Sequence, residues 1–145
     1  MNIREVSVRY RTTNIPLMEG NRFQNSKQVF DAFKEMALEP VEVFRVLLLD
    51  CKNRLLFYED VSRGSLNASL VHPREVFWSA IFHRAAAIVC IHNHPSGDPE
   101  PSLEDRNITA RLRDAGQLLG IRLLEHIVIG GDCFYSFADH GDLTV

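Results

Sequence analysis

Two histidines one residue apart, a loop stiffened by prolines and a later aspartate make up the segment best suited to chemistry. His92 and His94 follow the apolar run 88–91, which is typical of a buried strand. Because alternate side chains of a strand point the same way, we expect the two imidazoles to project together from its end. Asp105 falls in the first turn of a helix that Ser102 can cap. Two imidazoles and one carboxylate are the ligand set of a catalytic zinc site that keeps an open fourth position.

Each of these residues also has a purely structural interpretation. A Ser-x-x-Asp step is a common capping box, and an aspartate in a first helical turn suits the helix dipole without any metal. Cys90 could add a thiolate ligand, although a cysteine inside an apolar strand is more often a small buried residue. Asp98 could replace Asp105, although a loop aspartate more often braces a turn. The pattern predicts a metal site at His92, His94 and Asp105 and leaves these alternatives open.

The other four histidines have no partner at a ligand spacing. His72 precedes a proline and is expected at a helix cap, and His83 is expected at the C-terminal end of that helix, where positive charge is favourable. His126 lies inside the apolar run 121–129 and is predicted to be a hydrogen-bonded strand residue. His140 lies in the polar tail.

Composition predicts one globular domain and excludes several kinds of partner. The chain has 145 residues, of which 46% are apolar and 24% charged. A net charge of −3 with scattered Arg and Lys argues against direct nucleic-acid binding. No stretch reaches membrane-spanning length, and the N-terminus lacks a signal-peptide pattern. Cys51, Cys90 and Cys133 do not suggest a disulfide framework, so a cytoplasmic protein with no membrane partner is expected.

Apolar periodicity and turn residues predict alternating strands and helices. Strands are expected over residues 6–10, 41–49, 55–58, 66–71, 86–91, 121–129 and 133–137, and helices from Asn25 or Ser26 to Pro40, from Pro73, and from Ser102 to Leu119. Ile81 is expected on the buried face of its helix, and Leu119 is expected on the apolar face of the last helix. Several strands are joined by tight turns, which indicates an α/β (α+β) fold with a mixed, partly antiparallel central sheet flanked by helices.

The spacing from His92 to Asp105 resembles, at every fixed position, the JAMM motif of the JAB/MPN-type metalloprotease superfamily. The stretch PREVFWSAIFHRAAAIVCIHNHPSGDPEPSLEDRNITARLRDAGQLLGIRLLEHIVIGG is similar to the RadC branch, and the similarity runs over about residues 25–137. The resemblance implies that His92, His94 and Asp105 bind one Zn²⁺ ion. It also implies that Ser102 lies beside the bound water or the oxyanion, in a JAB/MPN-like fold with cytidine-deaminase-like layering.

The same resemblance implies a catalytic glutamate well upstream, at the start of a core strand. Glu42, in PVEVFRVLLLD, occupies that place, although composition alone would assign it as an ordinary solvated carboxylate. Glu75, in PREVF, is the rival and is expected to be structural, because glutamate is favoured near a helix start. The implied organisation is an N-terminal strand and loop over 1–24, a JAMM/RadC-like catalytic domain over 25–137 and a short tail over 138–145.

The implied activity is that of a zinc-dependent metallopeptidase-like hydrolase of amide or isopeptide bonds, with metal-activated water and Glu42 as general base. Three alternatives stay open: a DNA-repair-associated accessory protein, a catalytically inactive JAB-type binding module, and a hydrolase of another carbonyl substrate. RadC-type proteins carry a DNA-repair label, but residues 1–24 are too short and too polar for a helix-hairpin-helix module. The sequence leaves open which protein or peptide is cleaved and whether the chain forms oligomers through the edge of its terminal hairpin.

Overall fold

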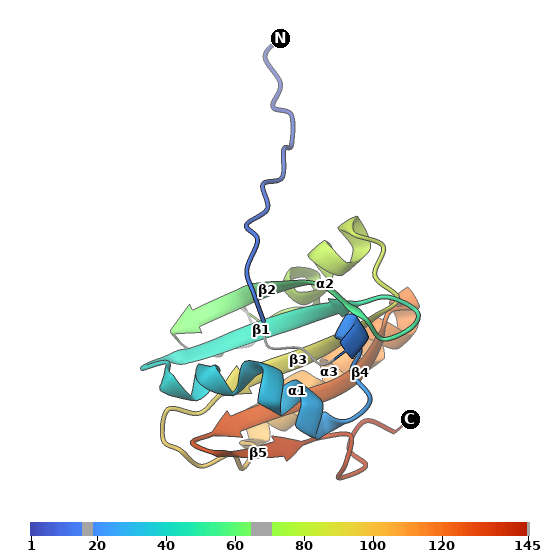
Figure 1. Ribbon diagram of the computed structural model, residues 1–145. Helices are drawn as coiled ribbons and strands as arrows, with labels where there is room; N and C mark the ends of the chain where they lie inside the picture. Colours follow the sequence, from blue (N-terminus) through green and yellow to red (C-terminus); the bar gives the residue numbers. More distant parts are fainter. Residues whose placement is uncertain (16–18, 65–70, 145) are drawn as a thin grey trace.

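The computed structural model describes residues 1–15, 19–64 and 71–144, and in them a five-stranded mixed sheet lies between layers of helices (Figure 1). The strands are β1 (Glu42–Leu49), β2 (Leu55–Gly64), β3 (Ala87–Asn93), β4 (Arg122–Gly130) and β5 (Cys133–Ser136). The helices are α1 (Ser26–Phe33), α2 (Pro73–Phe82) and α3 (Leu103–Leu119), with 3-10 turns η1 (Glu19–Asn21) and η2 (Lys34–Leu38). These elements confirm the predicted α/β class.

The sheet has the strand order β2-β1-β3-β4-β5. Strands β3 and β4 are parallel, and every other neighbouring pair is antiparallel. A parallel pair needs a long crossover, which α3 provides, whereas the antiparallel hairpins β1–β2 and β4–β5 need only short turns. The mixed, partly antiparallel sheet is therefore confirmed.

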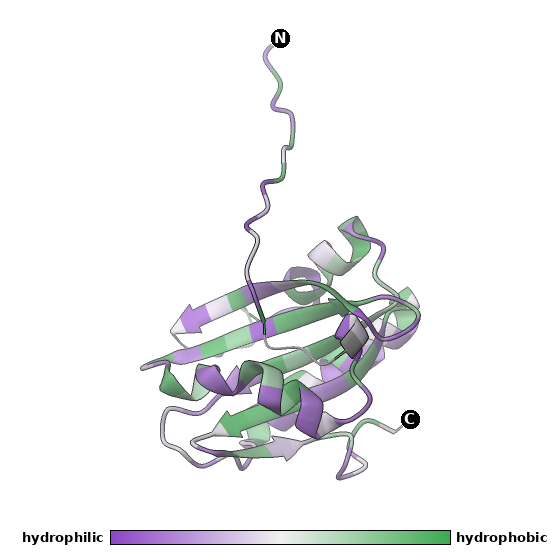
Figure 2. Cartoon of the chain, in the orientation of Figure 1, coloured by the Kyte–Doolittle hydropathy of each residue, from purple (hydrophilic) through white to green (hydrophobic). Residues whose placement is uncertain are grey.

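The central strands are apolar on both faces because helices cover both faces of the sheet. Helix α1 and η2 cover one face, where Leu47, Val89 and Ile127 are buried. Helices α2 and α3 cover the other, where Phe44 and Cys90 are buried. Figure 2 shows the central strands as largely hydrophobic and α1 as a helix with many hydrophilic residues. Polar side chains carried inward by these strands are therefore held in a rigid, dry setting.

Helix ends follow the capping residues of the sequence. The side chains of Asn25, His72 and Ser102 each accept a hydrogen bond from a first-turn backbone N–H of α1, α2 and α3. Gly120 ends α3 in the left-handed conformation, at φ 71°. Within the described ranges, every helix is too short or too polar to traverse a lipid bilayer.

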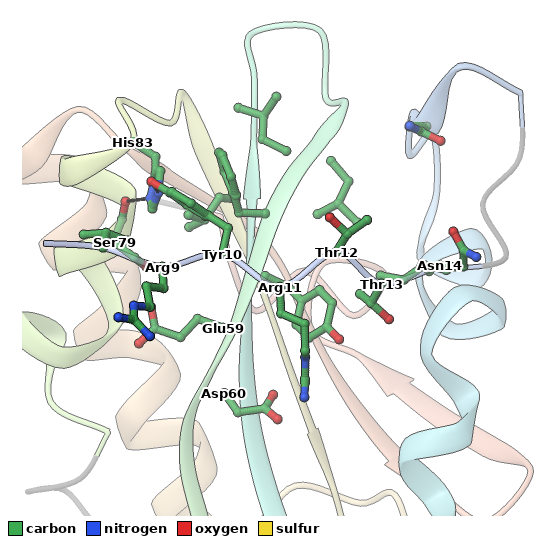
Figure 3. Close-up of a pocket in the computed structure, with 18 of the residues that line it drawn as sticks. Arg9, Tyr10, Arg11, Thr12, Thr13, Asn14, Glu59, Asp60, Ser79 and His83 are labelled. Atoms are coloured by element: carbon green, nitrogen blue, oxygen red, sulfur yellow. Dashed lines mark hydrogen bonds between the residues drawn. The ribbon is translucent and has the colours of Figure 1, made fainter.

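The predicted first strand is wrong, since residues 6–10 form no strand. Val6 is 85% exposed, so the weak apolar alternation has no buried face to support it. Residues 8–15 instead cross β2 near α2 and line a groove of ≈ 790 Å³ (Figure 3). There the Tyr10 hydroxyl lies 2.9 Å from Nε2 of His83.

Smaller differences lie at helix surfaces and strand ends. Ile81 is 54% exposed, so the prediction that it is buried is wrong. Leu119, the last residue of α3, is 46% exposed. Strand β2 continues past Tyr58 to Gly64 because it pairs with β1 along its whole length. The predicted strand 66–71 lies outside the described residues except for Val71, which belongs to a turn.

Candidate metal centre

The end of β3 and the start of α3 bring two imidazoles and one carboxylate together. Nε2 of His92 lies 3.1 Å from Nε2 of His94 and 3.4 Å from Oδ1 of Asp105. Nε2 of His94 lies 3.1 Å from Oδ2 of Asp105. The three residues offer donor atoms that all lie within 4.8 Å of one another, and the group could hold a metal ion. The expected convergence is present, although the residues come from two different elements.

Strand β3 and the loop after it fix both imidazoles. His92 is fully buried at the end of β3, and the backbone N–H of His94 extends the pairing by donating to the carbonyl of Ile129, at 2.7 Å. Nδ1 of His94 lies 2.8 Å from the carbonyl oxygen of Asp98, which can accept only from a protonated Nδ1. When His94 is neutral, it therefore presents the lone pair of Nε2 to the centre, as a metal ligand must.

Gly130 of β4 allows that loop to approach the sheet. A Cβ atom at Gly130 would lie 2.4 Å from the backbone nitrogen of Pro99 and 2.8 Å from the carbonyl oxygen of Gly97. Any side chain would displace the loop that holds His94. Gly97 itself, at φ +87°, makes the turn. Gly130 is a functional position that the sequence reasoning missed, because its partner lies in a different part of the chain.

Asp105 is positioned by the capping box at the start of α3. The Ser102 hydroxyl oxygen accepts from the Asp105 backbone N–H at 3.0 Å, and Oδ2 of Asp105 accepts from the Ser102 N–H at 2.9 Å. The structural interpretation of Ser-x-x-Asp is thus confirmed, and it coexists with the metal-site interpretation. The capping contacts leave Oδ1 of Asp105 facing His92.

Charge within the group favours an ionised carboxylate. Burial opposes ionisation of Asp105, but hydrogen bonds from His92 and His94, when these imidazoles carry a proton on Nε2, outweigh it and hold the pKa of Asp105 below its usual range. The same hydrogen bond to Asp105 raises the pKa of His94, burial opposes this, and the Glu42 carboxylate adds to the rise. At neutral pH the group therefore contains the negative charge of the Asp105 carboxylate.

The donor set fits a small divalent cation. Ligand atoms about 2.0–2.1 Å from a tetrahedral zinc ion lie roughly 3.3 Å apart. The two imidazole nitrogens lie 3.1 Å apart, and each has its nearest Asp105 oxygen at a similar distance, Oδ2 at 3.1 Å from His94 and Oδ1 at 3.4 Å from His92. Two imidazoles and a carboxylate also leave a fourth position to solvent or substrate, as in catalytic rather than structural sites.

Glu42 reaches the same site from β1. Phe44 pairs with His92 in the β1–β3 ladder, and their rings stack at 5.9 Å, so extending the ladder places Glu42 opposite His94 on the same face. A pocket of ≈ 270 Å³ is lined by Glu42, His94, Pro95, Ser96, Ser102, Glu104 and Asp105. Glu42 and Ser102 thus share a pocket with two members of the metal group.

Asn93, between the two histidines, holds the backbone on both sides of Glu42. Its Oδ1 accepts from the Val43 N–H at 2.7 Å, and its Nδ2 donates to the Val41 carbonyl at 2.9 Å. The side chain points to the face opposite the histidines, because it alternates with them along β3. Sequence reasoning gave Asn93 no role, since its partners lie in a distant segment.

Asn93→Ala is expected to lower the free energy of unfolding by about 2–4 kcal/mol, because each buried backbone group left without a partner costs about 1–3 kcal/mol. Urea denaturation would measure this change. Asn107→Ala is the control, since Asn107 is exposed on α3 and should change stability by no more than about 0.5 kcal/mol. Equal stability of Asn93→Ala and the unmodified protein would remove Asn93 from this role.

His126 of β4 lies directly behind His92. Its Nε2 is 2.8 Å from Nδ1 of His92, and its Nδ1 is 2.6 Å from the Thr109 hydroxyl of α3. His126 is confirmed as a hydrogen-bonded strand residue, but its partner is a site residue, and sequence spacing could not show this. Burial holds the pKa of His126 well below its ordinary value, and the nearby His92 adds to the effect.

The remaining candidates have structural positions. Cys90 is fully buried, and burial raises the pKa of its thiol far above the usual range, so it is a small core residue. The Asp98 side chain accepts from the Glu100 N–H and braces the loop, as predicted. Glu75 lies in the first turn of α2. His72 caps α2 at its start and His83 at its end, while His140 stacks on Tyr135 in the tail.

Fold and site together define a JAB-type domain with a candidate metal centre at the end of β3. The family model described as "RadC-like JAB domain" matches residues 23–142, and the chain belongs to this family. It is 51% identical over 138 residues to a "UPF0758 protein" of Geotalea uraniireducens, which covers 94% of this chain and 60% of that protein. It is 50% identical over 134 residues to a "UPF0758 protein" of Trichlorobacter lovleyi, covering 92% and 57%.

A more distant relative is the "UPF0758 protein PM1152" of Pasteurella multocida, 42% identical over 137 residues. This match covers 94% of the chain and 60% of the relative. The chain therefore spans little more than half the length of these curated relatives. The names of these relatives state no activity.

Proposed function

We propose that this protein is a zinc-dependent hydrolase of amide or isopeptide bonds, in which His92, His94 and Asp105 hold one Zn²⁺ ion. The observation that carries the proposal is the convergence of two imidazole nitrogens and the Asp105 carboxylate, with contacts of 3.1–3.4 Å between residues and the Glu42 carboxylate in the same pocket as two of them. Family membership supports it. A structural zinc site would use a fourth protein ligand, and the only His, Cys, Asp or Glu group of this kind found in the described residues has three members.

The chain's own residues supply the proton transfers. When bound, zinc acts as a Lewis acid and lowers the pKa of water from 15.7 to about 7. Glu42 accepts a proton from the attacking water and passes it to the leaving amine, as a general base and then a general acid. Its place at the start of β1, fixed by Asn93, keeps the carboxylate in the pocket without using it as a ligand.

Ser102 stabilises the negative charge that forms on the substrate carbonyl oxygen. Its hydroxyl oxygen already accepts the Asp105 N–H, which leaves the hydroxyl proton free to donate into the pocket. A positioned donor of this type stabilises an oxyanion without reorganising during the reaction.

The substrate is a protein or peptide in this proposal, and the compartment is the cytoplasm. Cys51, Cys90 and Cys133 are all free, which supports a reducing environment. The net charge of −3 gives no support to direct nucleic-acid binding by this domain. An inactive binding module is the weaker alternative, because Glu42 and Ser102 both line the pocket.

The test is metal content followed by a cleavage screen. We expect about one zinc per chain after dialysis of the purified protein and cleavage of members of a peptide and isopeptide library. A chelator should abolish cleavage, and added zinc should restore it. Protein that retains no stoichiometric metal would overturn the metal site. Full zinc with no cleavage of any library member, by this chain or by a full-length relative, would favour the binding module.

A further inference from the structure

A continuous hydrogen-bonded network leads from His92 through His126 to α3. Nδ1 of His92 lies 2.8 Å from Nε2 of His126, and Nδ1 of His126 lies 2.6 Å from Oγ1 of Thr109. Oγ1 of Thr109 lies 2.7 Å from the carbonyl oxygen of Asp105. The His92 and His126 side chains are fully buried, and Thr109 is 2% exposed. Solvent therefore cannot replace any member of the network.

The number of protons fixes the direction of each bond. The Thr109 hydroxyl has a single proton, which it donates to the Asp105 carbonyl oxygen, so its oxygen accepts from Nδ1–H of His126. A neutral imidazole carries one N–H, so Nε2 of His126 is left as an acceptor for Nδ1–H of His92. His92 then presents the lone pair of Nε2 to His94 and Asp105.

We propose that His126 and Thr109 are positioning residues that hold His92 in the tautomer whose Nε2 can bind a metal ion. The network begins at one proposed ligand and ends on the backbone of another, Asp105, so it also ties the end of β3 to the first turn of α3. For His94, the carbonyl oxygen of Asp98 takes the place that His126 has for His92, as the partner of Nδ1. The inference rests on the proposed metal site, since a tautomer matters to function only if His92 is a ligand.

The packing of His126 allows its hydrogen bonds to be removed without opening a cavity. Its ring stacks on Phe137 at 4.9 Å and meets Phe44 edge-on at 5.5 Å, so a phenyl ring suits the same space. Thr109→Val replaces one hydroxyl by a methyl group of similar size, whereas Thr109→Ser keeps the hydroxyl. In Thr109→Val, Nδ1–H of His126 has no acceptor, which favours the opposite tautomer in both imidazoles.

Zinc affinity by competition with a chromophoric chelator is the first readout. We expect His126→Phe and Thr109→Val to weaken zinc binding by about 10- to 100-fold, the usual cost of losing an outer hydrogen-bond partner of a ligand. Thr109→Ser should stay within about threefold of the unmodified protein. His140→Phe is the control, because His140 also stacks on an aromatic ring but lies outside the network. Equal affinities across Thr109→Val, Thr109→Ser and His126→Phe would overturn the proposal.

The tautomers of His92 and His126 in the metal-free protein can be measured by ¹⁵N-histidine NMR. This measurement tests the positioning role separately from the proposed function. We expect His92 and His126 to carry their protons on Nδ1, and Thr109→Val to move the His92 proton to Nε2. Observing these tautomers in a protein that binds no zinc would refute the proposed function, and His126 and Thr109 would then set the tautomer of His92 without serving a metal site. Tight zinc binding with a proton on Nε2 of metal-free His92 would refute the positioning role alone.

Discussion

Glu42→Gln is expected to lower the rate of peptide-bond hydrolysis by about 10²- to 10⁴-fold while zinc binding is retained, the usual contribution of a positioned general base. The amide is nearly the same size as the carboxylate but cannot accept a proton at neutral pH. Glu42 is half-buried and lines the pocket, yet it does not belong to the group of ligand-type atoms that could hold the ion. The variant should therefore lose turnover on any substrate from the cleavage screen but keep its zinc stoichiometry after dialysis.

Two other carboxylates provide matched controls for Glu42. Glu75→Gln changes the rival residue in the first turn of α2, and its turnover should equal that of the unmodified protein. Glu104→Gln changes an exposed carboxylate that lines the same pocket, which tests whether pocket charge alone matters. If Glu42→Gln turns over substrate as fast as the unmodified protein, Glu42 is not the base. A large loss in Glu104→Gln would transfer that role to Glu104.

The parts of the site that are local in sequence could be predicted from it. His92 and His94 lie two apart on a strand, and Ser102 and Asp105 lie three apart at a helix start, so strand and helix geometry alone orient each pair. The apolar run before the histidines and the prolines after them fix where the strand ends. These regularities hold in any fold that buries the strand.

Other contributions depend on tertiary structure and could not be read from the chain. Glu42 comes opposite His94 only because β1 and β3 pair in one particular register, so resemblance rather than spacing identified it. Asn93, His126 and Gly130 each act on a partner that is distant in sequence or in another element. In the sequence alone, Asn93 looks like an ordinary polar residue, His126 like a core residue and Gly130 like a turn residue.

The difference between local sequence signals and tertiary contacts also explains why the predicted strand over residues 6–10 is wrong. Alternation over residues 6–10 is a local signal, but a strand also needs a neighbour that buries one of its faces. The sheet ends at β2, and the N-terminal segment crosses that strand instead of pairing along it (Figure 3). A local pattern predicts an element reliably where the packing agrees with it, as for β1 and β3, which are buried on both faces.

Asp105→Asn is expected to weaken zinc binding at least about 100-fold, more than the loss of an outer partner, because it removes the only anionic donor of the group. The amide keeps the size of the side chain, and its oxygen can still accept the Ser102 N–H, so α3 should remain capped. The hydrogen bond to Asp105 is also the largest cause of the raised pKa of His94, which should fall toward its ordinary value in the variant. Chelator competition would measure the affinity, and circular dichroism would verify the helix content.

Asp98→Asn is the matched control, because Asp98 is the carboxylate that could otherwise have served as the ligand. Its side chain accepts the Glu100 N–H, whereas His94 is held by its backbone carbonyl, which the substitution leaves in place. Zinc affinity of Asp98→Asn should therefore remain within about threefold of the unmodified protein. Unchanged zinc stoichiometry in Asp105→Asn would remove Asp105 from the ligands, and a loss confined to Asp98→Asn would assign the third ligand to the loop. Because both residues lie beside His94, only the difference between the two variants separates a lost ligand from a disturbed loop.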